Sequence, residues 1–174
     1  MQRTNWYVIT GAPCSGKTSV IKALEQLGYP VVHEVARAYI DKELKKGKSI
    51  ARIKSDILLF ERHILYKKIE IEKSLSKDAT VFLDRGVPDS IGYYIIEGLY
   101  PDEPIKKSKQ TRYKKIFFFE KLLFEKDAVR SEDDKIAAEL DRILKESYQT
   151  LWYEIISVPI LTVKDRVDFI LKHL

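Results

Sequence analysis

A strand–loop–helix unit, VITGAPCSGKTSVIKAL, opens the chain and limits the folds available to it. An apolar, β-branched run over 6–10 leads into Gly11-x-x-x-x-Gly16-Lys17-Thr18, and apolar residues then recur at helical spacing as far as Leu27. This spacing is the signature of a phosphate-binding loop, whose glycines let backbone N–H groups turn inward around phosphate oxygens at the start of a helix. The predicted nucleotide-binding residues are Gly11, Ala12, Pro13, Cys14, Ser15, Gly16, Lys17, Thr18 and Ser19.

Three side chains of this pattern carry predicted chemical roles. Lys17 can reach the terminal phosphates, and the Thr18 hydroxyl can hold Mg²⁺. Asp84 ends the apolar run 80–84, which is the Walker B pattern, and in a phosphate-loop protein such a carboxylate holds Mg²⁺, usually through water. The alternative for Asp84 is a helix cap or an ordinary loop acid.

Composition is typical of one globular domain. The chain has 174 residues, of which 45% are hydrophobic and 33% charged, so residues 1–174 are predicted to form a single domain. The lone Cys14 excludes an internal disulfide and lies at an unspecified position of the loop, which disfavours a nucleophilic role. No apolar run approaches the length of a membrane span, and residues 1–10 lack the basic start and cleavage site of a signal peptide. These features predict a cytoplasmic protein without a membrane span.

Strands and helices alternate along the whole chain. The predicted strands cover 6–10, 29–34, 80–84, 115–119 and 153–158. Between and after them we expect helices over 16–27, 35–46, 50–75, 89–97, 131–151 and 163–173, with a polar loop over 98–114. Such alternation predicts an α/β fold of three layers, with a five-stranded parallel sheet between helices.

Polar residues at the carboxyl ends of these strands are functional candidates, because ligands of parallel sheets bind there. Glu34 ends the strand 29–34, with Arg37 one helical turn later, and Arg85 and Asp89 follow Asp84. Asp89 also starts the helix 89–97 as a predicted cap. The alternative for Glu34 is an acid that complements the dipole of the following helix.

Several segments resemble a known family. Asp84-Arg85-Gly86 is similar to the acid–arginine pair of thymidylate kinases and deoxyribonucleoside kinases, which implies that Arg85 contacts a phosphate or substrate-side carboxylates. Glu34 matches the carboxylate with which deoxyribonucleoside kinases bind and deprotonate the acceptor hydroxyl. Together with the phosphate loop and the segments 33–37, 84–90 and 158–170, these residues resemble the NadR-like AAA-type ATPase domain family of P-loop NTPases and kinases.

The resemblance implies a nucleoside- or nucleotide-kinase-like fold that binds ATP or GTP, and a lid that closes over the phosphates. Residues 122–135 lie where such a lid belongs, and Arg130 could neutralise charge on the transferred phosphoryl group. The alternative for Arg130 is an exposed arginine near a helix start. Arg37 and Asp89 are further substrate-side candidates.

Two other groups of residues have competing interpretations. The basic segment 106–115 could contact nucleic acid, an anionic lipid or a phosphorylated substrate, but a solvated connection into the next strand is the favoured interpretation. Tyr93, Tyr94 and Tyr100 could stack on a base, although packing explains them better.

The sequence therefore predicts a Mg²⁺-dependent kinase that transfers the γ-phosphoryl group of ATP to a small, nucleoside-like hydroxyl acceptor. Lys17, Glu34, Asp84 and Arg130 are the predicted catalytic residues. The alternative is a regulatory NTPase that binds ATP or GTP and hydrolyses it slowly. The chain is too short for the helical lid domain of AAA-type motors.

Overall fold

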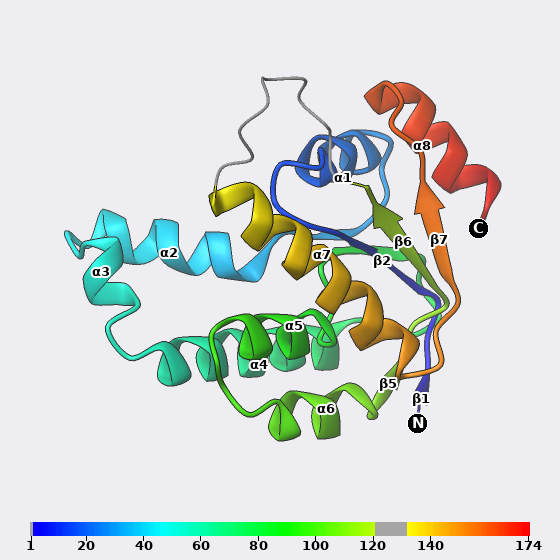
Figure 1. Cartoon of the computed structure of the whole chain (residues 1–174). Helices are drawn as coiled ribbons and strands as arrows, with labels where there is room; N and C mark the ends of the chain where they lie inside the picture. The colour runs from blue at the N-terminus through cyan, green and yellow to red at the C-terminus, as the bar shows by residue number, and fades with distance from the viewer. Residues whose placement is uncertain (1, 121–131) are drawn as a thin grey trace.

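The computed structural model describes residues 2–120 and 132–174, and its centre is a five-stranded parallel sheet (Figure 1). The strands lie in the order β3 (Val31–Val32), β4 (Val81–Asp84), β2 (Trp6–Thr10), β6 (Lys115–Phe119) and β7 (Ile155–Val158). Every neighbouring pair is parallel. The predicted five-stranded parallel sheet is confirmed.

Helices cover both faces of this sheet (Figure 1). Their bounds are α1 (Lys17–Gln26), α2 (Val35–Lys45), α3 (Ile50–Ile53), α4 (Ile57–Ser74), α5 (Asp89–Ile96), α6 (Asp102–Ser108), α7 (Glu132–Gln149) and α8 (Val163–Lys172). Residues 132–135 of the predicted lid form the first turn of α7, while the rest of that segment, including Arg130, lies outside the described residues.

The alternation of β2 explains the three layers, because successive side chains of a strand point to opposite faces. Tyr7 and Ile9 pack in one cluster with α1 and α8, whereas Trp6 and Val8 pack in another with Ile91 of α5 and Tyr148 of α7. All five residues of β2 are buried, as expected of a strand with helices on both sides. The parallel strands all end at one edge, where the phosphate loop follows β2.

The predicted single helix over 50–75 is wrong, since α3 and α4 are separate. Ser49 accepts a hydrogen bond from the Arg52 N–H at 3.3 Å, and Asp56 Oδ1 accepts one from the Leu59 N–H at 2.9 Å. Two N-terminal caps seven residues apart start two helices, because each cap residue leaves the helical backbone conformation. The break allows α3 to turn back toward α2 (Figure 1).

The predicted loop over 98–114 also contains regular structure. Helix α6 has Asp102 and Glu103 in its first turn and Lys106 and Lys107 in its last, a distribution that complements the helix dipole. The short strand β5 (Thr111–Arg112) pairs in parallel with β1 (Gln2–Arg3). Long-range pairing with the N-terminus orders a segment whose own residues carry only a weak local pattern.

Several cations of the basic segment 106–115 make contacts within the molecule. Arg112 donates to the Leu151 carbonyl at 2.7 Å, Lys114 donates to Asn5 Oδ1 at 2.9 Å, and Lys107 lies 5.2 Å from the ring centroid of Tyr66. The segment leads into the start of β6, at the edge of the sheet opposite the phosphate loop. These contacts agree with the interpretation as a connection.

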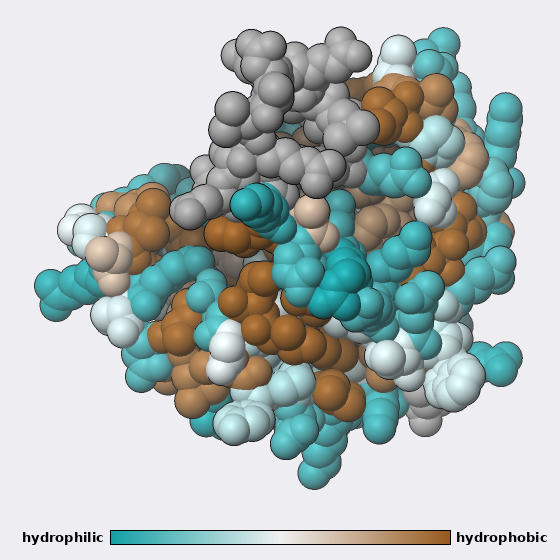
Figure 2. All heavy atoms as spheres, in the orientation of Figure 1, coloured by the Kyte–Doolittle hydropathy of each residue, from teal (hydrophilic) through white to brown (hydrophobic). Residues whose placement is uncertain are grey.

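The surface shown in Figure 2 mixes charged and apolar side chains. Apolar side chains gather over α5 and over the region of α2 and α3, two helices that contribute the exposed residues Leu44 and Ile50. In the ranges that the structure describes, no helix is long and apolar enough to cross a membrane.

Candidate functional site

The loop between β2 and α1 has a backbone that requires glycine. Gly11 has a φ of 132° and Gly16 a φ of 88°, and Cys14 between them also has a positive φ of 62°. A Cβ atom on Gly11 would lie 2.3 Å from the carbonyl oxygen of Phe119 at the end of β6. The first glycine of the motif is therefore needed both for its conformation and for the close approach of two backbones.

Arg166 of α8 contacts this loop through its guanidinium group. Its Nη1 donates to the Ser15 carbonyl at 2.7 Å and its Nε to the Pro159 carbonyl at 3.1 Å, and the side chain is only 3% exposed. A Cβ atom on Gly16 would lie 2.9 Å from the same Nη1. Sequence reasoning missed this role; the only signal was a charged residue among the apolar positions of the last helix.

Lys17 folds back over the loop. Its Nζ donates to the Ala12 carbonyl at 2.6 Å and to Ser15 Oγ at 3.0 Å. Burial, assisted by the nearby Arg85, lowers the pKa of Lys17 to about 8, against the opposing effect of Asp84 and Glu34. A bound polyanion would raise the pKa of Lys17 again, because it stabilises the charged ammonium. Protonated Lys17 is therefore more stable with phosphate in the cleft than without it.

Asp84 and Thr18 are the predicted Mg²⁺ ligands, and their surroundings fit that role. Asp84 is 2% exposed, and its Oδ1 is a buried oxygen without a hydrogen-bond partner among the described residues. Burial raises the pKa of Asp84 to about 6. Both residues line the same cleft. Mg²⁺ is commonly held by one or two protein oxygens together with phosphates and water, which agrees with the lack of a larger cluster of acids, histidines or cysteines in the described ranges.

Arg85 joins the phosphate loop to the substrate side. It has a φ of 70°, and its buried guanidinium donates from Nη1 to the Gly11 carbonyl at 3.0 Å. The same nitrogen lies 3.3 Å from Asp89 Oδ1, and Nε lies 3.4 Å from Glu34 Oε1. Arg85 therefore lies between the loop and two carboxylates.

Glu34 lies at the N-cap position of α2, yet its side chain accepts no capping hydrogen bond from the helix. The carboxylate is instead turned toward Arg85, and its Oε2 lies 4.0 Å from Nε of the exposed Arg37. The Glu34 side chain is 24% exposed, so one side remains open to a ligand. This orientation places a carboxylate at the open side of Arg85.

Asp89 lies beneath the site. It is fully buried and accepts hydrogen bonds from the Thr10 hydroxyl at 2.5 Å, the Tyr148 hydroxyl at 2.5 Å and the Gly86 N–H at 2.8 Å. It is the first residue of α5 rather than its side-chain cap. These contacts hold the turn that carries Arg85 against the end of β2.

A further carboxylate contacts the loop from α7. Asp141 Oδ1 accepts a hydrogen bond from the Ala12 N–H at 2.5 Å. Asp141 belongs to no sequence motif and lies 129 positions from Ala12 along the chain, so sequence reasoning did not find this contact.

Two adjoining cavities open at this edge of the sheet. The phosphate cleft, lined by residues 13–19 with Glu34, Asp84 and Arg85 among others, has a volume of about 720 Å³. The inner pocket, between α2, α3, α4 and α5, has a volume of about 350 Å³. Residues that line both cavities are Glu34, Arg37, Asp41, Arg85 and Tyr93. The arrangement offers one compartment for phosphates and a second for another small molecule.

Comparisons with known proteins agree with this geometry. A family model described as an AAA domain matches residues 6–166. The chain belongs to this family. No curated protein matches the chain. The predicted family and the kinase-like three-layer fold are confirmed.

Solved structures that share the fold of this AAA domain include three nucleotide-related proteins. Thymidylate kinase from Candida albicans is 14% identical with a TM-score of 0.65, covering 98% of this chain and 91% of the kinase. Deoxyadenosine kinase from M. mycoides, with dCMP and dCDP bound, is 14% identical with a TM-score of 0.66, covering 97% of both chains. NadR in complex with NR is 14% identical with a TM-score of 0.68, but this chain covers only 50% of NadR.

The three tyrosines occupy different places in the AAA domain. Tyr93 lines both cavities, and the Arg85 guanidinium lies 5.3 Å from its ring centroid. Tyr94 is buried, and Tyr100 is 90% exposed. Of the three, Tyr93 is the one that lines a cavity described here, so it is the tyrosine that can contact a bound ring.

Proposed function

We propose that this AAA domain is a Mg²⁺-dependent kinase that transfers the γ-phosphoryl group of ATP to a hydroxyl group of a small, nucleoside-like acceptor. The observation that carries the proposal is the position of the Glu34–Arg85 pair, which lines both the phosphate cleft and the inner pocket. A carboxylate and a cation at that junction suit an acceptor hydroxyl that meets a phosphoryl group.

The phosphate cleft would bind the donor. Backbone N–H groups of the loop and the Lys17 ammonium provide positive charge for the β and γ phosphates, and Arg85 adds a second buried cation. Phosphoryl transfer needs mainly alignment and charge neutralisation, because the protein forms no covalent bond in it. Thr18 and Asp84 would hold Mg²⁺, which would supply neutralisation of phosphate charge when it is bound.

Glu34 would act on the acceptor. Its open carboxylate can accept a hydrogen bond from the acceptor hydroxyl and orient the oxygen toward the phosphoryl group. It can take the hydroxyl proton as the new oxygen–phosphorus bond forms and the bond from the γ phosphorus to the β–γ bridging oxygen breaks, which releases ADP. Arg85 limits how far the Glu34 side chain can turn, since Nε lies 3.4 Å from Oε1. Arg37 and Asp41 line both cavities and would contact the substrates, and Asp89 would act from beneath through Arg85.

Arg130 remains our proposed lid cation, although it lies outside the described residues. The use of ATP rather than GTP and a cytoplasmic location are likewise proposals.

The test is an ADP-release assay with Mg²⁺ and ATP against nucleosides, nucleotides, sugars and vitamins, with mass spectrometry of the products. We expect at least one nucleoside-like compound to accelerate ADP release and to gain one phosphoryl group. Slow ADP release that no acceptor accelerates would overturn the kinase proposal in favour of the regulatory NTPase. K17A serves as the inactive control.

A further inference from the structure

One buried carboxylate has no role in the phosphate chemistry described above. Glu61 lies in α4, is 4% exposed and lines the inner pocket. It makes no hydrogen bond or ion pair with the residues that the structure describes, although Phe60 and Ile64 pack beside it in the same helix. Its oxygens are not among the enclosed side-chain atoms that lack a partner, in contrast to Asp84 Oδ1, so they open into the pocket, where a polar group of a ligand can meet them.

The nearest charges do not supply a partner. Lys68 and Lys54 favour the ionised form of Glu61 and Glu97 opposes it, but burial outweighs them and raises the pKa of Glu61. Lys68 Nζ donates to the Gly86 carbonyl at 3.0 Å and to Ser90 Oγ at 3.2 Å. Lys54 Nζ lies 3.8 Å from Glu97 Oε1. Both cations are engaged with other groups, which leaves the oxygens of Glu61 for a molecule in the pocket.

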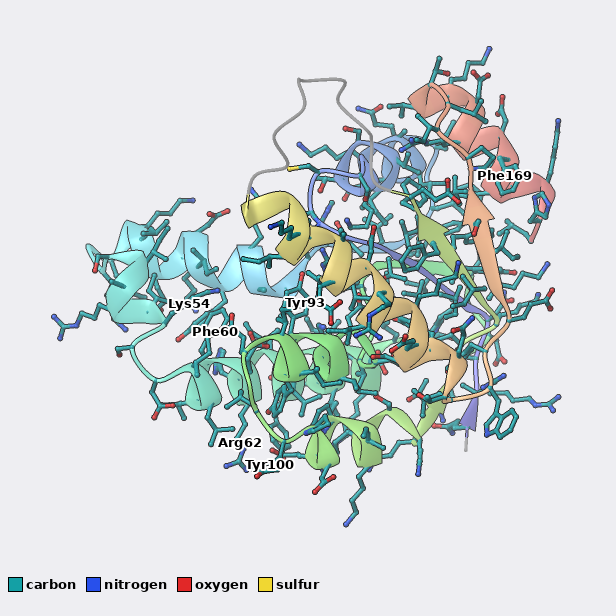
Figure 3. All side chains as sticks on the ribbon, in the orientation of Figure 1. Lys54, Phe60, Arg62, Tyr93, Tyr100 and Phe169 are labelled. Carbon is teal, nitrogen blue, oxygen red and sulfur yellow. The ribbon has the colours of Figure 1, made fainter. Side chains whose placement is uncertain are left out.

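The other walls of the inner pocket suit a flat ring. Phe60 and Tyr93 contribute aromatic faces, and Ile40 and Ile64 contribute aliphatic surface. In Figure 3, Lys54 and Phe60 lie in the space between α2 and α4, and Tyr93 comes from α5. An apolar pocket with a few polar groups is typical of small-molecule sites, in which the polar groups decide specificity.

We propose that Glu61 determines which acceptor this protein takes, by accepting hydrogen bonds from an amino or amide N–H group on the edge of the acceptor ring. This inference rests on the proposed function only in the assignment of the inner pocket to the acceptor. A nucleoside with an exocyclic amino group satisfies the carboxylate. A uracil or thymine ring offers a single ring N–H between two carbonyl oxygens, which would face the carboxylate unfavourably. A site built around a hydrogen bond rejects a ligand that leaves its buried polar group unpaired.

The experiment measures binding of cytidine, adenosine, guanosine, uridine and thymidine by calorimetry, without ATP. The wild-type protein should bind at least one amino-bearing nucleoside about tenfold to a hundredfold more tightly than uridine or thymidine. In E61Q this ratio should shrink at least tenfold, because a glutamine amide offers one donor edge and one acceptor edge and no negative charge. E70Q is the matched control, since Glu70 is an exposed glutamate of the same helix that pairs with Lys67, and it should leave the ratio unchanged.

Three results would overturn the inference: no measurable binding of any amino-bearing nucleoside, equal binding of uridine and of the amino-bearing nucleosides, or an unchanged ratio in a folded E61Q protein. Thermal unfolding of each variant establishes that it is folded. The comparison of ligands on the wild-type protein needs no variant, so it decides the matter if E61Q does not fold.

The proposed kinase activity fails or succeeds separately. Preferential binding of amino-bearing nucleosides without any phosphorylated product would leave the Glu61 assignment standing and remove the kinase proposal. Phosphorylated product with no preference between ring types would leave the kinase proposal standing and remove the Glu61 assignment.

Discussion

The phosphate cleft and the inner pocket are built in different ways. Residues 13–19 give the cleft one continuous stretch of backbone, with side chains from α1, α2, α5 and the end of β4 around it. The inner pocket is made of side chains from four helices, α2 to α5, that meet only in the folded protein. Backbone N–H groups can bind any phosphate, whereas side chains distinguish one ring from another. Under the proposed function, the loop backbone would bind the donor, and a few side chains of the inner pocket would select the acceptor.

The two compartments also differ in charge. Lys17 and Asp84 line only the cleft, Glu61 and Lys68 line only the inner pocket, and Arg85 lines both. Glu34 lines both cavities beside Arg85. If this contrast is correct, changes on the two sides should affect different substrates.

The largest effect is expected at Lys17. K17A removes the ammonium that meets the β and γ phosphates, so turnover should be abolished and ATP affinity should fall by about 10²-fold. Calorimetry with ATP and Mg²⁺ measures this, and acceptor binding should be nearly unchanged. Wild-type ATP affinity in K17A would show that the loop is not the phosphate site. K67A, a change of an exposed lysine of α4 that lines neither cavity, is the control.

A change of Glu34 should lower acceptor-dependent turnover without a change in ATP affinity. E34Q keeps the shape and loses the charge, so acceptor-dependent turnover should fall by about 10²–10⁴-fold while ATP affinity stays close to that of the wild type. A helix-dipole acid would instead cost about 0.3–1 kcal/mol of stability and leave turnover per folded molecule unchanged. Thermal unfolding, ATP binding and turnover on one preparation separate these outcomes.

The same difference between the phosphate cleft and the inner pocket explains which parts of the site could be predicted from the sequence. The loop, Lys17 and Asp84 were predictable because their spacing is local and their neighbours form a strand and a helix. The inner pocket was not predicted, since Phe60, Glu61 and Ile64 read as ordinary positions of an amphipathic helix. Arg166 and Asp141 were also missed, because each contacts the loop from a distant position in the chain. Asp56 was a readable helix cap, but the apolar stripe that continues across it concealed the break between α3 and α4.

A smaller change is expected at Asp84. D84N replaces the carboxylate with a neutral amide, so the Mg²⁺ concentration that gives half of maximal activity should rise by about 10–100-fold. A Mg²⁺ titration of turnover checks this, and nucleoside binding without ATP should not change. An unaltered titration would remove Asp84 from the metal site.

Glu72 belongs to a third region with no proposed role in either compartment. A change there tests whether the effects predicted above are specific to the two compartments. Burial raises the pKa of Glu72 from the ordinary 4.5 to about 7, although the Tyr113 hydroxyl donates to it at 2.6 Å. The unfolded chain releases this proton at a lower pH, so the contribution of Glu72 to stability is complete below about pH 4.5 and is lost as pH rises through about 7.

E72Q keeps a neutral acceptor for the Tyr113 hydroxyl. Denaturant unfolding should show the variant close to the wild type near pH 4.5, and more stable by up to ~3 kcal/mol near pH 8. ATP and nucleoside affinities should stay the same. An identical pH dependence of stability in the two proteins would contradict the assignment.

The smallest effect is expected in the basic segment 106–115. Its exposed lysines Lys106 and Lys109 lie at the edge opposite the loop, and several of its other cations are engaged internally. We expect no measurable binding of nucleic acid or anionic vesicles at physiological salt, and no change in either site when both lysines become glutamine. Tight, salt-sensitive binding that these changes abolish would show a polyanion surface instead.

The contact of Arg166 with the phosphate loop has a consequence for synthesis of the chain on the ribosome. The loop is translated before most of the domain, but the guanidinium that donates to the Ser15 carbonyl at 2.7 Å is translated 151 positions later. Strand β6, whose last carbonyl meets Gly11, is also late. A nascent chain therefore carries the complete motif long before it carries the braced loop, and a nucleotide could stabilise the finished fold only after α8 has emerged.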